Sequence, residues 1–203
     1  MAHILLIRHG ENEFTKKGKL AGWIPGVHLN DAGRRQAAAL AEHLARFPIK
    51  AIYSSPLVRT LETARPLAEA KHLQVKKCQG IGEVRYGTWQ GKSLKVLRRR
   101  KLWPVLQQRP TAAQFPGGET MRAVQARAVE AVEEIAAGHR KQLVAVFSHG
   151  DVIRMILAHY LGMPLDLFQR IYIGTASISA VHVSAGTPMV TRINQAVPLP
   201  EAT

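Results

Sequence analysis

Two histidines occupy equivalent positions in this sequence, each directly after a short apolar run. Residues 4–7 (ILLI) lead into RHGE, which contains Arg8 and His9, and residues 144–147 (VAVF) lead into SHGD, which contains His149. An imidazole can act as a nucleophile, a proton carrier or a metal ligand near neutral pH. A single histidine at a strand end more often has a structural role, so only its combination with residues at other strand ends indicates a site.

A third strand-like run, residues 51–54, feeds a segment that carries Arg59 in its first helical turn. The carboxyl ends of parallel strands lie at one edge of a sheet, where ligands of open α/β folds bind. Two histidines and two arginines, Arg8 and Arg59, could therefore converge on one crevice. Helix N-termini there would add backbone N–H groups and positive dipole ends. The sequence thus predicts a pocket for a dianion that needs no metal.

The elements that must position these side chains alternate along the chain. Further strand candidates are residues 177–183 and 189–193. Helical periodicity is found from Asn30 or Asp31 to about residue 44, from Ser55-Pro56 to about residue 70, and over residues 119–137 and 149–161. Strands that alternate with helices predict βαβ units. We expect an α/β fold: a three-layer α/β/α sandwich whose central sheet is mostly parallel, with one antiparallel edge strand.

Length and composition favour one domain. The chain has 203 residues, of which 46% are hydrophobic and 21% are charged. We assign residues 1–195 to a single domain, the proline-containing stretch 85–118 to a cap or flap over the site, and residues 196–203 to a loose C-terminal tail. No run approaches the roughly 18 apolar residues of a membrane-spanning helix, and no basic leader is present, so we expect no membrane partner. Cys78 is the only cysteine, which excludes intrachain disulfides and indicates a cytoplasmic location.

The charge balance indicates an anionic partner. The formal net charge is +14 and the pI is about 10.5, as for proteins that attract nucleic acid, acidic lipid or phosphorylated metabolites. Lys92, Lys95 and Arg99 would share a helix face, beside the dense basic run 98–101. This stretch could attract substrates with a second acidic group, bind nucleic acid, or be a solvated surface. Aromatic residues make up only 6% and no nucleic-acid motif is found, so we do not expect nucleic acid as a partner.

The motifs of this chain resemble those of a known family. The matching blocks, in chain order, are residues 6–11, 22–23, 29–37, 54–64, 83–91, 115–120 and 148–150. Together they are similar to the signature of the histidine phosphatase superfamily, the group that contains the cofactor-dependent phosphoglycerate mutases. The resemblance extends to about residue 193 and implies a phosphoglycerate mutase-like fold.

This resemblance implies a role for each candidate residue. His9 would be the nucleophile and would form a phosphohistidine. Arg8 and Arg59 would hold the phosphoryl oxygens, and a protonated His149 would stabilise them. Glu83 would protonate the leaving oxygen and then activate water. The further phosphate or substrate contacts that it implies are Thr15, Gly22, Tyr86 and Gly150.

Phosphatases and mutases of this family differ in what attacks the phosphohistidine. The segment between Glu83 and His149 is shorter here than in the mutases, and residues 93–94 (SL) stand where mutases carry a lysine. Thr15 replaces an asparagine that many members have. In contrast, Tyr86 in the block ExxYG resembles the mutase form.

The shorter length leads us to predict a metal-independent phosphatase of small phosphomonoesters with no cofactor. The alternative is a 2,3-bisphosphoglycerate-dependent phosphoglycerate mutase, which would need that primer. A basic nucleic-acid-binding protein or a non-catalytic phospholigand-binding protein is a more remote alternative. The expected partner is a small phosphorylated metabolite, a homodimer is a further hypothesis, and the sequence does not identify the substrate.

Overall fold

The strands form one six-stranded sheet in the order β3-β2-β4-β1-β5-β6. The computed structural model describes residues 1–184 and 186–198. The strands are β1 (Ala2–Arg8), β2 (Ile49–Ser54), β3 (Val75–Lys77), β4 (Leu143–Ser148), β5 (Ile178–Val183) and β6 (Met189–Gln195). The predicted apolar runs are the inner strands β1, β4 and β2. Helices cover both faces of these strands, which explains why their sequences are continuously apolar rather than alternating.

The sheet is mixed, as predicted. β1 pairs in parallel with β4, β4 with β2, and β2 with β3, whereas β5 is antiparallel to both β1 and β6. The antiparallel strand β5 therefore lies one place in from the edge, and β6 is the edge strand outside it. The other edge strand, β3, escaped prediction because its three residues, Val-Lys-Lys, show no apolar run.

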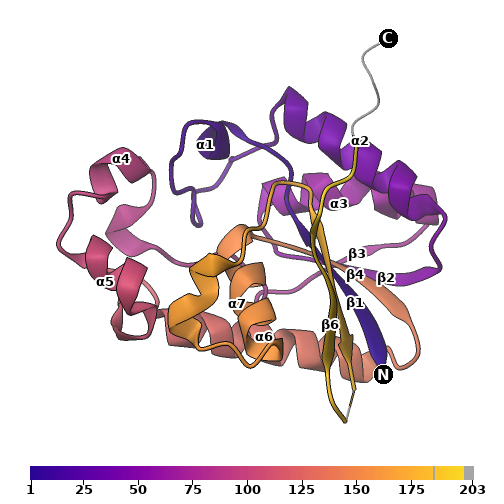
Figure 1. The fold of residues 1–203 in the computed structure, drawn as a ribbon. Helices are drawn as coiled ribbons and strands as arrows, with labels where there is room; N and C mark the ends of the chain where they lie inside the picture. The colour runs from indigo at the N-terminus through magenta and orange to yellow at the C-terminus, as the bar shows by residue number, and fades with distance from the viewer. Residues whose placement is uncertain (185, 199–203) are drawn as a thin grey trace.

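Four long helices pack on the two faces of the sheet. α2 (Asp31–Ala45) and α3 (Val58–Lys71) lie on one face, and α6 (Met121–Gly138) and α7 (Gly150–Tyr160) lie on the other (Figure 1). The α/β/α sandwich is thereby confirmed. The Asn30 side chain caps α2 by accepting from the backbone N–H of Gly33 at 2.9 Å, as an N-cap asparagine should.

The expected start of α3 at Ser55-Pro56 was wrong. The helix begins at Val58, and its N-cap residue, Leu57, makes no side-chain cap. The Ser55 hydroxyl instead contacts His149. Ser55, at the predicted start of the helix, thus contacts a residue of the site instead.

The segment 85–118 contains only short elements. These are η1 (Gly87–Trp89), α4 (Leu94–Leu97), α5 (Leu102–Gln108) and η2 (Pro110–Ala112). Figure 1 shows α4 and α5 at one end of the molecule, away from the strands. The helix face predicted through Lys92, Lys95 and Arg99 was wrong, because α4 spans only four residues and a turn separates it from α5.

Two apolar clusters stabilise the layers. One lies between the sheet, α6, α7 and the segment 85–118, and the other lies between the sheet, α2 and α3. Leu97 of α4 and Leu106 of α5 belong to the first cluster, so burial fixes the segment 85–118 to the main domain. Full burial of each such side chain contributes about 1.5–3 kcal/mol.

The expected loose tail at the C-terminus is described only in part. Residues 196–198 form no helix or strand, and the remainder of the expected loose tail, 199–203, lies outside the described residues. Within those described residues, every helix is too short or too polar to cross a membrane.

Candidate active site

The predicted strand-end residues meet at the carboxyl edge of the parallel strands. Arg8 ends β1, Ser148 ends the neighbouring strand β4, and the two residues are in register. The rings of His9 and His149, which follow them, have centroids 5.3 Å apart. Arg59 reaches them from the first turn of α3, with Nη2 3.2 Å from His149 Nδ1. Arg8, His9 and Arg59 line one cavity of about 450 Å³ together with residues of the segment 85–118, and His149 is fully buried behind them.

His9 is held as a neutral imidazole with one free nitrogen. Its Nδ1 lies 2.7 Å from the carbonyl oxygen of Gly10, and because a carbonyl only accepts, Nδ1 carries the proton. Burial, followed by the positive charges of Arg59 and Arg8, holds the pKa of His9 well below its usual range. The Nε2 lone pair is therefore available at neutral pH, which is what a nucleophilic histidine requires.

Close backbone packing fixes the loop that carries His9. A Cβ on Gly33, in the first turn of α2, would lie 2.0 Å from the carbonyl oxygen of Glu11, and a Cβ on Gly10 would lie 2.7 Å from the carbonyl oxygen of Gly33. The backbone N–H of Gly10 donates to Thr63 Oγ1 of α3 at 3.0 Å. The two glycines thus allow α2 to pack directly against the His9 loop.

Both arginines present unused donors at the site. Arg8 Nη1 donates to the carbonyl of Ile173 at 2.7 Å, and Arg59 Nη2 donates to the carbonyl of Gly22 at 3.0 Å. Among the residues described, Arg8 Nε and both Nε and Nη1 of Arg59 are buried without a hydrogen-bond partner. Burial lowers the pKa of both groups, but arginine remains charged. Buried cationic donors without partners are well suited to bind an anion.

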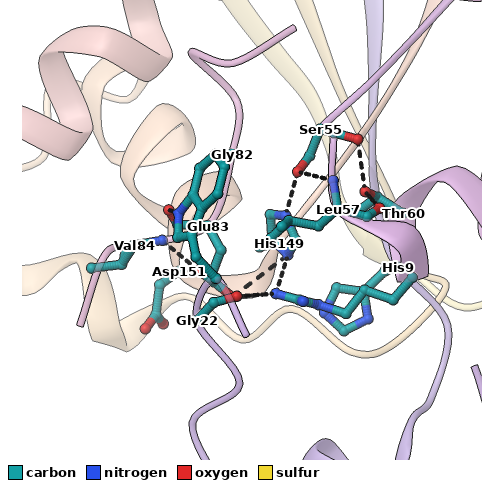
Figure 2. A network of polar contacts seen from close by, with 12 residues as sticks. His9, Gly22, Ser55, Leu57, Thr60, Gly82, Glu83, Val84, His149 and Asp151 are labelled. Carbon is teal, nitrogen blue, oxygen red and sulfur yellow. Dashed lines mark hydrogen bonds and ion pairs between the residues drawn. The ribbon is translucent and has the colours of Figure 1, made fainter. Parts of the chain in front are cut away.

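His149 differs from the expectation that it would be protonated. It is fully buried, with Nε2 2.8 Å from Ser55 Oγ and Nδ1 near the Arg59 donor (Figure 2). Nδ1 must accept from the guanidinium, so the ring proton is on Nε2. Burial and the charge of Arg59 hold the pKa of His149 well below its usual range. The hydrogen bonds and the lowered pKa of His149 therefore favour a neutral ring.

Glu83 is positioned by its backbone. Its carbonyl oxygen accepts from the indole N–H of Trp23 at 2.6 Å and from Arg127 Nη2 at 3.0 Å. Arg127 also pairs with Glu119, with Nε 2.8 Å from Oε1. The sequence analysis missed Arg127. The available signal was Glu119, which lies in the matched block at 115–120. Arg127, eight residues later, has the opposite charge and could have been tested as its ion-pair partner.

The Glu83 carboxyl is suited to carry a proton near neutral pH. Its Oε2 lies 3.5 Å from His149 Nδ1 and 3.8 Å from Arg59 Nη2. Burial raises the pKa of Glu83 to about 7, an effect that Arg59 opposes and Asp151 reinforces. The hydroxyl of Tyr86 lies 3.5 Å from Glu83 Oε1 and donates to Asp151 Oδ2 at 3.1 Å. Asp151 was also missed by the sequence analysis.

Three of the four remaining predicted substrate-binding residues line the cavity. Gly150 lines the cavity, and a Cβ there would lie 3.2 Å from Arg8 Nε, so only glycine leaves the guanidinium in place. Tyr86 also lines it. Gly22 does not, and acts on Arg59 through its carbonyl. Thr15 lines the cavity, but its hydroxyl bonds to the backbone of Asn12.

The outer part of the cavity has a different character. Its walls include Trp89, Leu94 and Trp103, and the two indoles are stacked with centroids 6.5 Å apart. Within the dense basic run only Arg98 lines the cavity. The segment 85–118 thus supplies an apolar wall with a cation, whereas Arg8, His9, Arg59 and Glu83 supply the polar part of the lining.

The site offers one set of metal ligands. Single donor atoms of His9, Glu83 and His149 lie within 4.8 Å of one another. Two guanidinium groups, those of Arg8 and Arg59, adjoin this set and would repel a divalent cation while attracting a dianion. The charge of the donor set therefore fits a phosphate group better than a metal ion.

A model of the histidine phosphatase superfamily (branch 1) matches residues 4–196. The chain belongs to this superfamily. A curated relative of this chain is phosphoserine phosphatase 1 of Hydrogenobacter thermophilus, 32% identical over 96% of this chain and 92% of the relative. A metal-independent phosphoserine phosphatase of Arabidopsis thaliana is 32% identical over 77% of this chain and 67% of the relative.

The fold of this chain is also found among solved structures. Bacillus stearothermophilus YhfR has a TM-score of 0.88 and 28% identity, with 95% of this chain and 96% of that chain covered. The predicted family, the phosphoglycerate mutase-like fold and an enzyme of the phosphomonoesterase class are thereby confirmed.

Proposed function

We propose that this protein hydrolyses small phosphomonoesters without a metal, through a phosphohistidine on His9. The observation that carries the proposal is His9 Nε2, a free lone pair on a neutral imidazole beside buried guanidinium donors that have no partner. A phosphoryl group would satisfy those donors and meet the nucleophile in one binding event.

The first half-reaction transfers the phosphoryl group to His9. The Nε2 lone pair attacks phosphorus, the bond from phosphorus to the alcohol oxygen breaks, and the Glu83 proton passes to that oxygen. The products are the free alcohol, phosphohistidine and the Glu83 carboxylate. Arg8 and Arg59 hold the phosphoryl oxygens in the loose transition state, and Gly150 supplies backbone at the N-terminus of α7.

The second half-reaction returns the enzyme to its starting state. The Glu83 carboxylate takes a proton from water as the water oxygen attacks phosphorus, and the bond from phosphorus to nitrogen breaks. Inorganic phosphate leaves, with Nε2 neutral and Glu83 protonated again. A raised pKa for Glu83 suits both roles, because the carboxyl must release and regain a proton near neutral pH.

In this proposal the protonation of His149 changes when the phosphoryl group binds. A bound dianion favours the imidazolium, so His149 takes a proton from solvent on Nδ1 when the phosphoryl group arrives. The hydrogen bond from Arg59 Nη2 to Nδ1 then breaks, Nδ1–H donates to a phosphoryl oxygen, and the proton returns to solvent when inorganic phosphate leaves. Ser55 accepts from Nε2 in both states and keeps the ring oriented.

Water, rather than a second hydroxyl, is the expected acceptor. The short stretch between Glu83 and His149 and the phosphoserine phosphatases among the relatives support hydrolysis over a phosphoglycerate mutase reaction. The segment 85–118 is the cap over the site in this proposal. Its apolar wall and Arg98 face the alcohol part of a phosphorylated metabolite.

The test is release of inorganic phosphate from a panel of small phosphomonoesters with EDTA present throughout. The expected result is turnover of one or a few members, with an acid-labile, base-stable phosphoprotein trapped during turnover. Loss of activity in EDTA that returns with a metal would overturn the metal-independent mechanism. Silence across the panel, followed by activity with a bisphosphoglycerate primer, would favour the mutase.

Location and assembly complete the proposal. We propose a cytoplasmic location. Cys78, a free, half-buried thiol, supports it because a reducing compartment keeps thiols unpaired. Association into a homodimer stays a prediction that light scattering on the purified protein checks. Binding to DNA that falls steeply with salt would support the nucleic-acid alternative.

A further inference from the structure

Asn12 carries a buried amide that the structure leaves without a partner. The residue is fully buried, it precedes α1 (Glu13–Lys16), and it lines the same cavity as Arg8 and His9. Its Nδ2 is one of the buried side-chain atoms that have no hydrogen-bond partner within the described residues. Buried polar groups are normally satisfied, so an unpaired one beside a cavity needs an explanation.

The other half of the amide fixes its orientation. Oδ1 accepts from the backbone N–H groups of Phe14 at 2.9 Å and Thr15 at 3.0 Å. An N–H group cannot donate to another N–H, so the two capping bonds identify Oδ1, and Nδ2 has to be the atom on the other side. A serine would cap α1 equally well. The cap therefore explains the oxygen of Asn12 but not its nitrogen.

The Thr15 hydroxyl is not available as a hydrogen-bond donor to phosphate, although Thr15 stands where many family members have an asparagine. Its Oγ1 donates to the carbonyl oxygen of Asn12 at 2.8 Å and accepts from the backbone N–H of Asn12 at 3.0 Å. The one hydroxyl proton is thus already used inside the capping box. The loop would lack a neutral side-chain donor for phosphate unless another residue provides one.

We propose that Asn12 Nδ2 is a donor to the phosphoryl group, supplying from position 12 the amide that this chain lacks at position 15. The inference rests on the proposed function, because it assigns a new residue to the same phosphoryl site. Asn12 Nδ2 joins Arg8 Nε and the free donors of Arg59, which are also buried and without partners. In this proposal a tetrahedral dianion bound in the cavity that all three residues line accepts hydrogen bonds from these donors.

Asn12→Ser isolates the amide, since it keeps a cap acceptor and removes Nδ2. The expected result is about tenfold weaker binding of inorganic phosphate and orthovanadate by calorimetry, a loss typical of one charge-assisted hydrogen bond. The value of kcat/KM should fall by a similar factor on ribose 5-phosphate and p-nitrophenyl phosphate alike, because the phosphoryl group is common to both. The melting temperature should stay within a few degrees of wild type.

Two further variants separate the amide from the cap. Asn12→Asp keeps the size and the cap but turns a carboxylate oxygen toward the dianion, so phosphate binding should fall by at least about 100-fold. The double variant Asn12→Ser with Thr15→Asn restores an amide to the loop and should regain most of the lost affinity. Asn30→Ser is the matched control: the same exchange at the N-cap of α2, outside the cavity lining, should leave phosphate affinity unchanged within about twofold.

Phosphate binding keeps the two proposals distinguishable, because it does not depend on turnover. Equal phosphate affinity in wild type and Asn12→Ser overturns the role of Asn12, whatever the enzyme hydrolyses. A tenfold loss in Asn12→Ser with no phosphohistidine in wild type supports Asn12 and overturns the catalytic function instead. A wild-type protein that binds neither anion overturns both.

Discussion

The two ends of the cavity are built in opposite ways. At the inner end, His9, Arg59 and His149 are at most 3% exposed and project from strand ends and a helix start within the main domain. At the outer end, Trp103 is half-buried and Arg98 is exposed, and both come from short helices or turns. Parallel strands in register fix the inner end, whereas the outer end is held by short helices whose Leu97 and Leu106 pack into the apolar cluster of α6 and α7. The difference indicates that the phosphoryl chemistry is rigidly determined and that the choice of alcohol is the adjustable part.

The chemistry of the two ends differs as sharply as their construction. The inner end concentrates positive charge and unsatisfied donors in a buried space, where electrostatic interactions are strong. The outer end combines indole rings with one exposed cation, whose attraction water weakens. Changes at the inner end should therefore abolish or slow the reaction on every substrate, and changes at the outer end should alter only the ranking of substrates.

The largest effect is expected from removal of the nucleophile. His9→Ala should lower phosphate release at least about 10⁴-fold on all substrates, because it removes the atom to which the phosphoryl group is transferred. The fold should persist, as measured by circular dichroism, and no acid-labile phosphoprotein should form. Substantial remaining turnover would contradict the assignment of His9.

Glu83→Gln should produce the next largest effect, and one that depends on the leaving group. Loss of the general acid should slow alkyl phosphates about 10²–10³-fold. Aryl phosphates should lose much less, because their leaving oxygen needs little protonation. An equal loss on both classes would count against Glu83 as the acid.

The pH dependence of the wild-type enzyme provides a second test of Glu83. Only the protonated carboxyl can donate, and its pKa is raised to about 7, so kcat/KM for alkyl phosphates should fall as the pH rises through that value. The same shift lowers the stability of the fold between pH 4.5, the ordinary pKa of this group, and about 7. Glu83→Gln should therefore become progressively more heat-resistant relative to wild type across this range. A flat difference in melting temperature would contradict the raised pKa.

Gly33→Ala tests the packing that fixes the inner end. In a helix this exchange normally stabilises a protein by up to about 1 kcal/mol. Here the new Cβ would lie 2.0 Å from the Glu11 carbonyl oxygen, so we expect destabilisation of about 2 kcal/mol by urea unfolding. Gly138→Ala is the control, because a Cβ at this residue of α6 meets nothing within 4 Å. A stabilised Gly33→Ala would show that α2 does not constrain the His9 loop.

The smallest effect is expected from the outer end. Arg98→Ala should reduce the preference for 3-phosphoglycerate over glycerol 3-phosphate by about two- to fivefold in kcat/KM, as expected for one solvent-exposed charge pair. These substrates share a primary phosphate and differ in a carboxylate. Orthovanadate affinity should be unchanged, and Arg99→Ala, an exposed neighbour outside the cavity lining, should change neither quantity. An equal effect of both variants would reduce the role of Arg98 to general surface charge.

The sequence was sufficient for the inner end because each element is short and locally encoded. Apolar runs buried on both faces predict strands, and Arg8, His9 and His149 are adjacent to those runs in the chain. Prediction failed where the pattern was weak or ambiguous. The three residues of β3 carry no periodicity, Ser55 reads as a helix cap although its hydroxyl contacts His149, and the basic residues at helical spacing do not form one helix.

The sequence by itself therefore determined which residues converge and what class of anion they attract, since both follow from strand ends and from formal charge. Only the tertiary structure decided their protonation states and hydrogen bonds. Burial lowers the pKa of His149 and raises the pKa of Glu83. The free amide of Asn12 follows from a cap that uses its oxygen alone. Burial and hydrogen-bond geometry depend on contacts between distant segments, and residue spacing does not encode those contacts.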